Sequence, residues 1–116
     1  MRLSIKRAYE LPEEGDGYRI LIDRIWPRGL SKKELELDLW MKTIAPSTAL
    51  RKWFNHETSK WDQFKERYEK ELSENTEDVE IIKQLMHKHE NVSLIYAAKD
   101  KAHNQAVILQ NFLKTK

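Results

Sequence analysis

The run of residues 92–97, Val-Ser-Leu-Ile-Tyr-Ala, constrains the fold most, because it is the clearest candidate for a buried β-strand. Residues 18–23 form a second run rich in β-forming side chains and predict a second strand. A loop and then a helix-forming segment follow each run. This alternation is typical of an α/β fold with a partly parallel sheet. We therefore predict a small, helix-rich α/β domain spanning residues 1–116, with a short, partly parallel central sheet.

Shorter patterns predict the remaining elements. Residues 3–7 alternate between apolar and polar side chains and predict a short strand, whereas residues 11–17 contain a proline and two glycines and predict a surface loop. Residues 35–39 again alternate and predict an extended segment after the first helix. Further helices are predicted up to Phe54, through Trp61 and Leu72, between residues 75 and 89, and from Ala102 to the C-terminus.

Polar residues mark where these helices are expected to begin. Ser31 with Glu34 has the spacing of a capping box, and Ser59 with Asp62 has the same spacing before the helix that contains Trp61. Ser47 is expected to cap the helix that ends near Phe54. Asp100, in the loop after residues 92–97, is a candidate cap for the last helix.

Composition excludes several classes of protein. The 116 residues include no cysteine, which excludes disulfides, a thiolate nucleophile and cysteine-ligated metals. No apolar run approaches the roughly 20 residues that cross a bilayer, and residues 1–7 lack the features of a secretory signal. We expect a cytoplasmic protein without membrane contact. The net charge of +2 is too small to indicate nucleic-acid binding by itself.

The segment Asp-Arg-Ile-Trp-Pro-Arg-Gly at residues 23–29 predicts a rigid, cationic, aromatic loop directly after a strand. A second loop, with Lys99, follows the strand at residues 92–97. Ligands of open α/β sheets bind at the carboxyl ends of the strands, and guanidinium groups bind phosphate or carboxylate in pairs of hydrogen bonds. We predict one anion pocket formed by Arg24, Arg28 and Lys99 and walled by Trp26. The alternative is structural, with the arginines stacked on the indole or paired with Asp23.

The histidines offer candidates for proton transfer. His103 follows the Lys99 loop, so its ring could act as a general acid or base, with Asp100 as its partner. His56 is a second candidate, although both histidines could equally be solvated or turn residues. His87 and His89 suit the end of a helix. The spacings supply no set of three converging ligands, so no metal site is predicted.

Several long motifs resemble the YeaO-like branch of the family called domain of unknown function 488. The matching segments span nearly the whole chain and are residues 23–29, 38–42, 45–48, 50–56, 61–64, 94–100 and 103–106. The resemblance implies a small bacterial or archaeal cytosolic α/β domain and no particular reaction. Its motif residues here are Arg24, Trp26, Pro27, Arg28, Lys42, Ser47, Arg51, His56, Lys99, Asp100, His103 and Asn104. Other branches carry cysteines near the last strand, where this chain has Tyr96 and Asn104, so thiol chemistry does not carry over.

The hypothesis that unites these observations is a domain that binds a small anionic ligand, phosphorylated or nucleotide-like, without a cofactor. The residues expected to bind it are Arg24, Trp26, Arg28, Lys42, Arg51, Lys99 and Asn104, and those expected to act in any catalysis are His103, His56 and Asp100. Two alternatives remain: a nucleic-acid-associated module, which predicts strong salt dependence, and a protein-interaction domain with an exposed apolar patch. Enzymatic activity and oligomeric state are left open.

Overall fold

The computed structural model describes residues 2–115 and contains a four-stranded sheet with the strand order β1-β4-β2-β3. The strands are β1 (Arg2–Arg7), β2 (Tyr18–Leu21), β3 (Leu39–Trp40) and β4 (Asn91–Tyr96). Each of the three strand pairings is parallel. The α/β class predicted from the sequence is confirmed, and the sheet is parallel throughout these residues rather than only in part.

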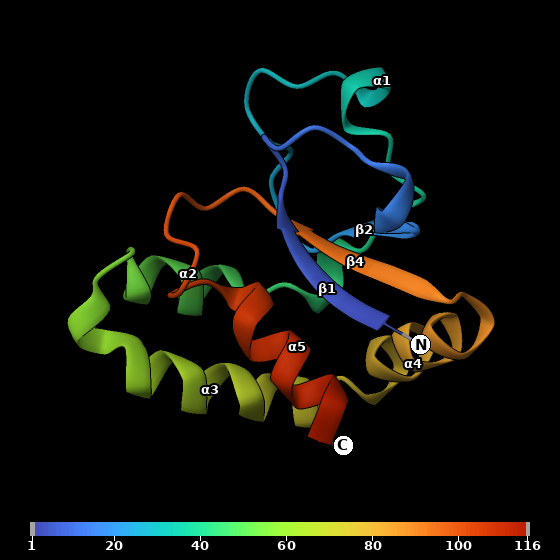
Figure 1. The fold of residues 1–116 in the computed structure, drawn as a ribbon. Helices are drawn as coiled ribbons and strands as arrows, with labels where there is room; N and C mark the ends of the chain where they lie inside the picture. Colours follow the sequence, from blue (N-terminus) through green and yellow to red (C-terminus); the bar gives the residue numbers. More distant parts are fainter. Residues whose placement is uncertain (1, 116) are drawn as a thin grey trace.

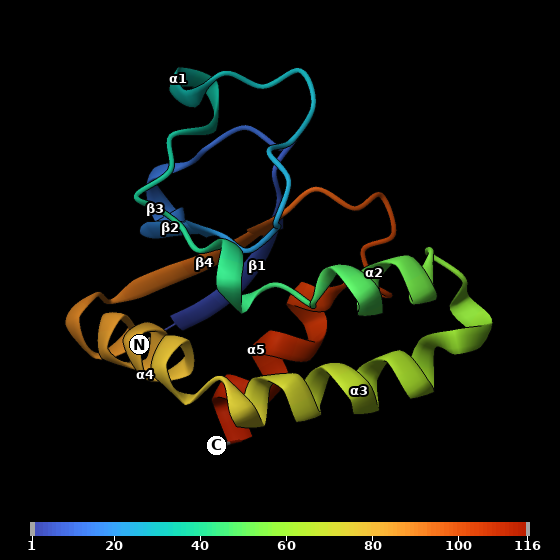
Figure 2. The same cartoon turned by 180° about the vertical axis from the view of Figure 1, so that it is seen from behind.

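The helices lie mainly on one side of this sheet (Figures 1 and 2). They are α1 (Lys32–Leu35), α2 (Thr48–Phe54), α3 (Trp61–Glu74), α4 (Thr76–Lys88) and α5 (Gln105–Thr115), with short 3-10 helices η1 (Glu14–Asp16), η2 (Lys42–Ile44) and η3 (Thr58–Lys60). The larger core cluster joins the sheet to α2 through α5. α1 and its flanking loops cover the opposite face, where Leu35 is buried against Leu21 and Ile95.

Strand β4 has buried side chains on both faces of the sheet. Leu94 and Tyr96 belong to the core on the side of the long helices, whereas Ile95 belongs to the cluster under α1. Successive side chains of a strand point to opposite faces, so a strand that is covered on both sides must be apolar at nearly every position. This explains why the run is apolar at nearly every position, with Ser93 as the polar exception, and confirms that it is a buried strand.

Two of the predicted helix caps are confirmed and two are wrong. Ser31 Oγ accepts a hydrogen bond from Glu34 N, and Ser47 Oγ accepts one from Leu50 N. Ser59 does not cap α3, because it lies inside η3, which runs directly into that helix. The last helix begins at Gln105 rather than Ala102, since Asn104 Oδ1 accepts from the first amides of α5.

Asp100 was predicted to cap the last helix, but it does not. Its Oδ1 accepts hydrogen bonds from the backbone N–H groups of Ala102 and His103 at 2.9 and 3.0 Å. These bonds close a turn over residues 100–103, directly before the Asn104 cap of α5. Asp100 thus shapes the loop after β4, and Asn104 performs the capping.

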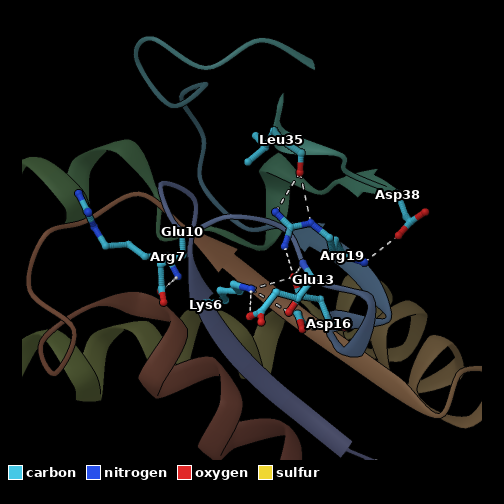
Figure 3. A network of polar contacts seen from close by, with 9 residues as sticks. Lys6, Arg7, Glu10, Glu13, Asp16, Arg19, Leu35 and Asp38 are labelled. Carbon is cyan, nitrogen blue, oxygen red and sulfur yellow. Dashed lines mark hydrogen bonds and ion pairs between the residues drawn. The ribbon is translucent and has the colours of Figure 1, made fainter. Parts of the chain in front are cut away.

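A buried polar network fixes η1 and α1 against the sheet (Figure 3). Arg19 Nη1 donates to Asp16 Oδ2 at 2.6 Å, while its Nε and Nη2 donate to the carbonyl of Leu35. Lys6 Nζ donates to Asp16 Oδ1 at 3.0 Å and to Glu13 at 2.8 Å. Burial acts to raise the pKa of Asp16, but the amide of Glu13 and the cations of Lys6 and Arg19 hold it below its usual value.

Candidate ligand-binding site

A cavity of about 660 Å³ lies beside the carboxyl ends of β2 and β4. Residues 23–28, from the loop after β2, and residues 97–100 and 103–105, from the loop after β4, line it together. Residues of α2 and α3 and the segment before α2 complete the wall. The volume lies within the range of roughly 300–1,000 Å³ that is typical of small-molecule sites. The two loops that the sequence singled out thus border one cavity, as expected for strands that run in parallel.

The walls of the cavity are largely apolar. Pro27, Pro46, Phe54 and Phe64 line it and are buried in the fold. The rings of Phe54 and Phe64 stack with their centroids 4.1 Å apart and an interplanar angle of 17°. These residues come from one loop, the segment before α2, α2 and α3, so packing of the helices on the sheet also shapes the cavity.

Arg24 and Trp26 line the cavity and also hold its loop in place. Arg24 Nε donates to the carbonyl of Pro46 at 2.7 Å, and its Nη2 donates to the carbonyl of Ala45 at 3.2 Å. Trp26 Nε1 donates to the carbonyl of Leu30, and the indole packs edge-on against Trp40. Both side chains therefore have structural contacts, but Arg24 binds backbone carbonyls rather than stacking on the indole or pairing with Asp23, which were the contacts that the structural alternative predicted.

Three basic side chains around the cavity make no hydrogen bond or ion pair within residues 2–115. Arg28, Arg51 and Lys99 are exposed and line it. Within residues 2–115, the nitrogen atoms of these three side chains make no hydrogen bond or ion pair, so they are available to a ligand. Lys42, which was predicted to join them, lies elsewhere: its ammonium sits over the ring of Trp40, 4.1 Å from the centroid.

The two candidate histidines both border the cavity. His103 Nδ1 lies 2.9 Å from Asp100 Oδ2, and its ring meets Trp61 edge-on. Hydrogen bonds from the amides of Ala102 and His103, together with the His103 ring, lower the pKa of Asp100. His56 is exposed and has a left-handed backbone with φ of 56°. The predicted pairing of His103 with Asp100 is thus present in the geometry.

Asn104 also lines the cavity, but the fold already uses its amide. The side chain is buried, and its Nδ2 donates to the carbonyl of Asp100 at 2.8 Å. Its Oδ1 caps α5. Asn104 therefore connects the loop after β4 to the helix that follows, which is a positioning role within the site.

Asp23 is the residue that the sequence reasoning did not select. Its carboxylate lines the cavity, accepts a hydrogen bond from Ala97 N at 2.9 Å and accepts a second one from Gln105 Nε2. Burial raises the pKa of Asp23 to about 6, against the lowering effects of these hydrogen bonds and of the charge on Arg51. Carboxyl groups with raised pKa values are concentrated at functional sites. The available signal was an acid that ends an apolar strand at the carboxyl edge of the sheet.

The raised pKa of Asp23 predicts a measurable effect on stability. A folded-state pKa of about 6, above the usual 3.8, means that the proton binds the folded state more tightly. This contribution is fully present below pH 3.8 and is lost as the pH rises through about 6. Asp23→Asn removes this titration. The free energy of unfolding of the variant minus that of wild type should therefore be about 2 kcal/mol higher at pH 7.5 than at pH 4. Urea unfolding at both pH values measures the change, and a difference that is independent of pH would contradict it.

Comparison with known proteins assigns the family. A family model described as "Inactive DUF488-N3 subclade" matches residues 2–116. The chain belongs to this family. It is 40% identical to the uncharacterized protein YeaO of Escherichia coli over 115 residues, which cover 99% of each chain. It is 34% identical over 112 residues to the uncharacterized proteins Mb3100c of Mycobacterium bovis and Rv3073c of Mycobacterium tuberculosis, covering 97% of this chain and 93% of theirs.

These matches confirm the resemblance to the YeaO-like branch that the motifs indicated. No solved structure matches the chain. Within residues 2–115, none of the helices has both the length and the apolar character needed to span a membrane. The same residues contain no group of three His, Asp or Glu side chains placed to hold a metal ion.

Proposed function

We propose that this member of the DUF488 family binds a small phosphorylated ligand in the cavity between the loops that follow β2 and β4. The observation that carries the proposal is a set of three exposed cations that border an apolar-walled cavity: Arg28, Arg51 and Lys99. Within residues 2–115 their side-chain nitrogen atoms make no hydrogen bond or ion pair. Guanidinium and ammonium groups bind phosphate oxygens through short, charge-assisted hydrogen bonds.

The remaining residues would serve this binding in different ways. Arg24 and Trp26 hold the loop after β2 in the shape that presents Arg28, and Asn104 does the same for the loop that carries Lys99. The aromatic and proline side chains of the wall would receive the less polar part of the ligand. A concave site of this kind favours a small ligand over a nucleic-acid duplex, whose phosphates follow a broad, open surface.

The family assignment favours ligand binding without catalytic turnover. The matching model describes its subclade as inactive. The His103–Asp100 pair has the geometry to move a proton, but the proposal assigns it no reaction. It would instead be a neighbour of the bound phosphate, to which a protonated imidazole could donate a hydrogen bond.

A thermal-shift measurement with ribose 5-phosphate tests the proposal. Ribose 5-phosphate at about 100 times its dissociation constant should stabilise the protein by about 2.7 kcal/mol and raise Tm by on the order of 10 °C. Arg51→Ala and Lys99→Ala should each weaken binding about tenfold, because each removes one charge-assisted hydrogen bond. Lys52→Ala is the matched control, since it removes the same charge from an exposed position beside Arg51 on α2.

Two outcomes would count against the cavity as a phosphate site. The first is equal binding of ribose 5-phosphate by wild type, Arg51→Ala and Lys99→Ala. The second is a shift seen only with single-stranded oligonucleotides and erased by salt, which would support the nucleic-acid alternative.

A further inference from the structure

The cavity is lined by groups of opposite charge, and this limits the chemical class of its ligand. Its exposed border carries Arg28, Arg51 and Lys99, whereas the half-buried carboxylate of Asp23 lies at the carboxyl end of β2. A ligand that bridges these regions needs an anionic group for the border and a different group for Asp23. The apolar side chains that also line the cavity favour a flat, weakly polar body for the rest of the ligand.

The hydrogen bonding of Asp23 defines what that inner group must be. An ionised carboxylate is an acceptor only, with about four lone-pair positions on its two oxygens. Ala97 N uses one position on Oδ2, and Gln105 Nε2 uses one on Oδ1. Each oxygen has one recorded donor and can accept one more, so the carboxylate has the capacity for two further donors. At pH 7.5, above its pKa of about 6, Asp23 is ionised and fits this description.

The charges that line the cavity indicate whether the ligand's pair of hydrogen-bond donors is cationic or neutral. The side chains that line the cavity include four cations, Arg24, Arg28, Arg51 and Lys99, and two carboxylates, Asp23 and Asp100. This surplus of positive charge opposes a second cation from the ligand, so adjacent neutral N–H groups are favoured. Asp100 is a poorer acceptor for them, because its oxygens already bind two backbone amides and His103.

We propose that the ligand is a guanine nucleotide, with Asp23 accepting hydrogen bonds from the ring N1–H and the exocyclic N2–H of the base and the exposed cations binding its phosphate. Guanine presents these two donors next to each other on one flat, neutral edge. Adenine presents a donor beside an acceptor, and that acceptor would face a carboxylate oxygen. This inference rests on the proposed function and makes Asp23 the residue that determines specificity.

Isothermal titration of the full chain at pH 7.5 with GMP, AMP and ribose 5-phosphate tests this assignment. GMP should bind at least about tenfold more tightly than AMP, which is the size of discrimination expected from one bidentate contact. Asp23→Asn should abolish that preference while retaining ribose 5-phosphate, because the substitution leaves the cations in place. Asp62→Asn is the matched control, since it removes the same charge from an exposed position on α3, and it should keep the preference.

Failure of phosphate binding and failure of the guanine assignment would give different results. If none of the three phosphates binds, or if Arg51→Ala binds all of them like wild type, the proposed function itself fails. If ribose 5-phosphate binds and needs Arg51, but wild type does not distinguish GMP from AMP, only the guanine assignment is overturned. A preference for GMP that persists in Asp23→Asn would also overturn it. So would tighter binding of a guanine-containing oligonucleotide than of GMP, because the ligand would then not be a free nucleotide.

Discussion

Asp16→Ala should lower the free energy of unfolding by about 3–5 kcal/mol, which is the cost of removing one partner from a buried ion pair. Asp16 lies between Lys6 and Arg19, and the side chain of Arg19 is only 4% exposed. Without the carboxylate, the guanidinium would keep its bonds to the carbonyl of Leu35 but lose the charge that compensates its burial. Urea unfolding at pH 7 measures the change.

Glu13→Ala provides the matched control for this prediction. Glu13 binds the same Lys6 ammonium at 2.8 Å, but 75% of its side chain is exposed. An exposed ion pair of this kind contributes at most about 1 kcal/mol. Equal losses in Asp16→Ala and Glu13→Ala would show that burial of the network has no energetic consequence, and would contradict the account of how η1 and α1 are held to the sheet.

Gly17→Ala should destabilise the protein by about 3 kcal/mol or more, combining backbone strain with overpacking. Gly17 has φ of 66° and ψ of −135°, a conformation that is essentially restricted to glycine. A Cβ at this position would lie 2.1 Å from the carbonyl oxygen of Asn91, at the start of β4. Relief of that contact requires β2 and β4 to separate, although these strands are paired. Thermal unfolding measures the effect.

Gly15→Ala is the control within the same turn. A Cβ on Gly15 would have no other heavy atom within 4 Å. The substitution should therefore change the stability by less than about 1 kcal/mol. If Gly15→Ala were as damaging as Gly17→Ala, flexibility of the turn rather than its close approach to β4 would explain both results.

The sequence predicted those parts of the fold in which a local pattern has one physical meaning. A run that is apolar at nearly every position can only be a strand covered on both sides or a buried helix, and its length and β-branched residues favoured the strand that became β4. Ser31 followed by Glu34 satisfies the free amides of a helix wherever that helix packs. Ser59 with Asp62 has the same spacing, but there the preceding 3-10 turn runs directly into α3.

Topology made the meeting of two loops predictable, whereas the binding and catalytic roles of their residues stay predictions. Parallel strands place their following loops at one edge of the sheet, so the meeting of the Arg28 and Lys99 loops could be expected from topology. Whether a side chain is available depends on tertiary contacts that sequence does not display. Arg24 donates to two carbonyls and Lys42 lies over an indole, whereas Arg51 makes no hydrogen bond or ion pair within the described residues 2–115. The raised pKa of Asp23 likewise depends on burial by distant segments.

An NMR titration can show whether the loops after β2 and β4 form one site for a phosphorylated ligand. Ribose 5-phosphate is added to ¹⁵N-labelled protein, and the backbone amide shifts are followed by residue. We expect the largest changes at residues 23–26, at Arg28, at Arg51 and at residues 97–105, and we expect them to saturate with one dissociation constant. Changes spread evenly over the surface, or concentrated at the opposite edge of the sheet around Tyr18 and His89, would contradict it.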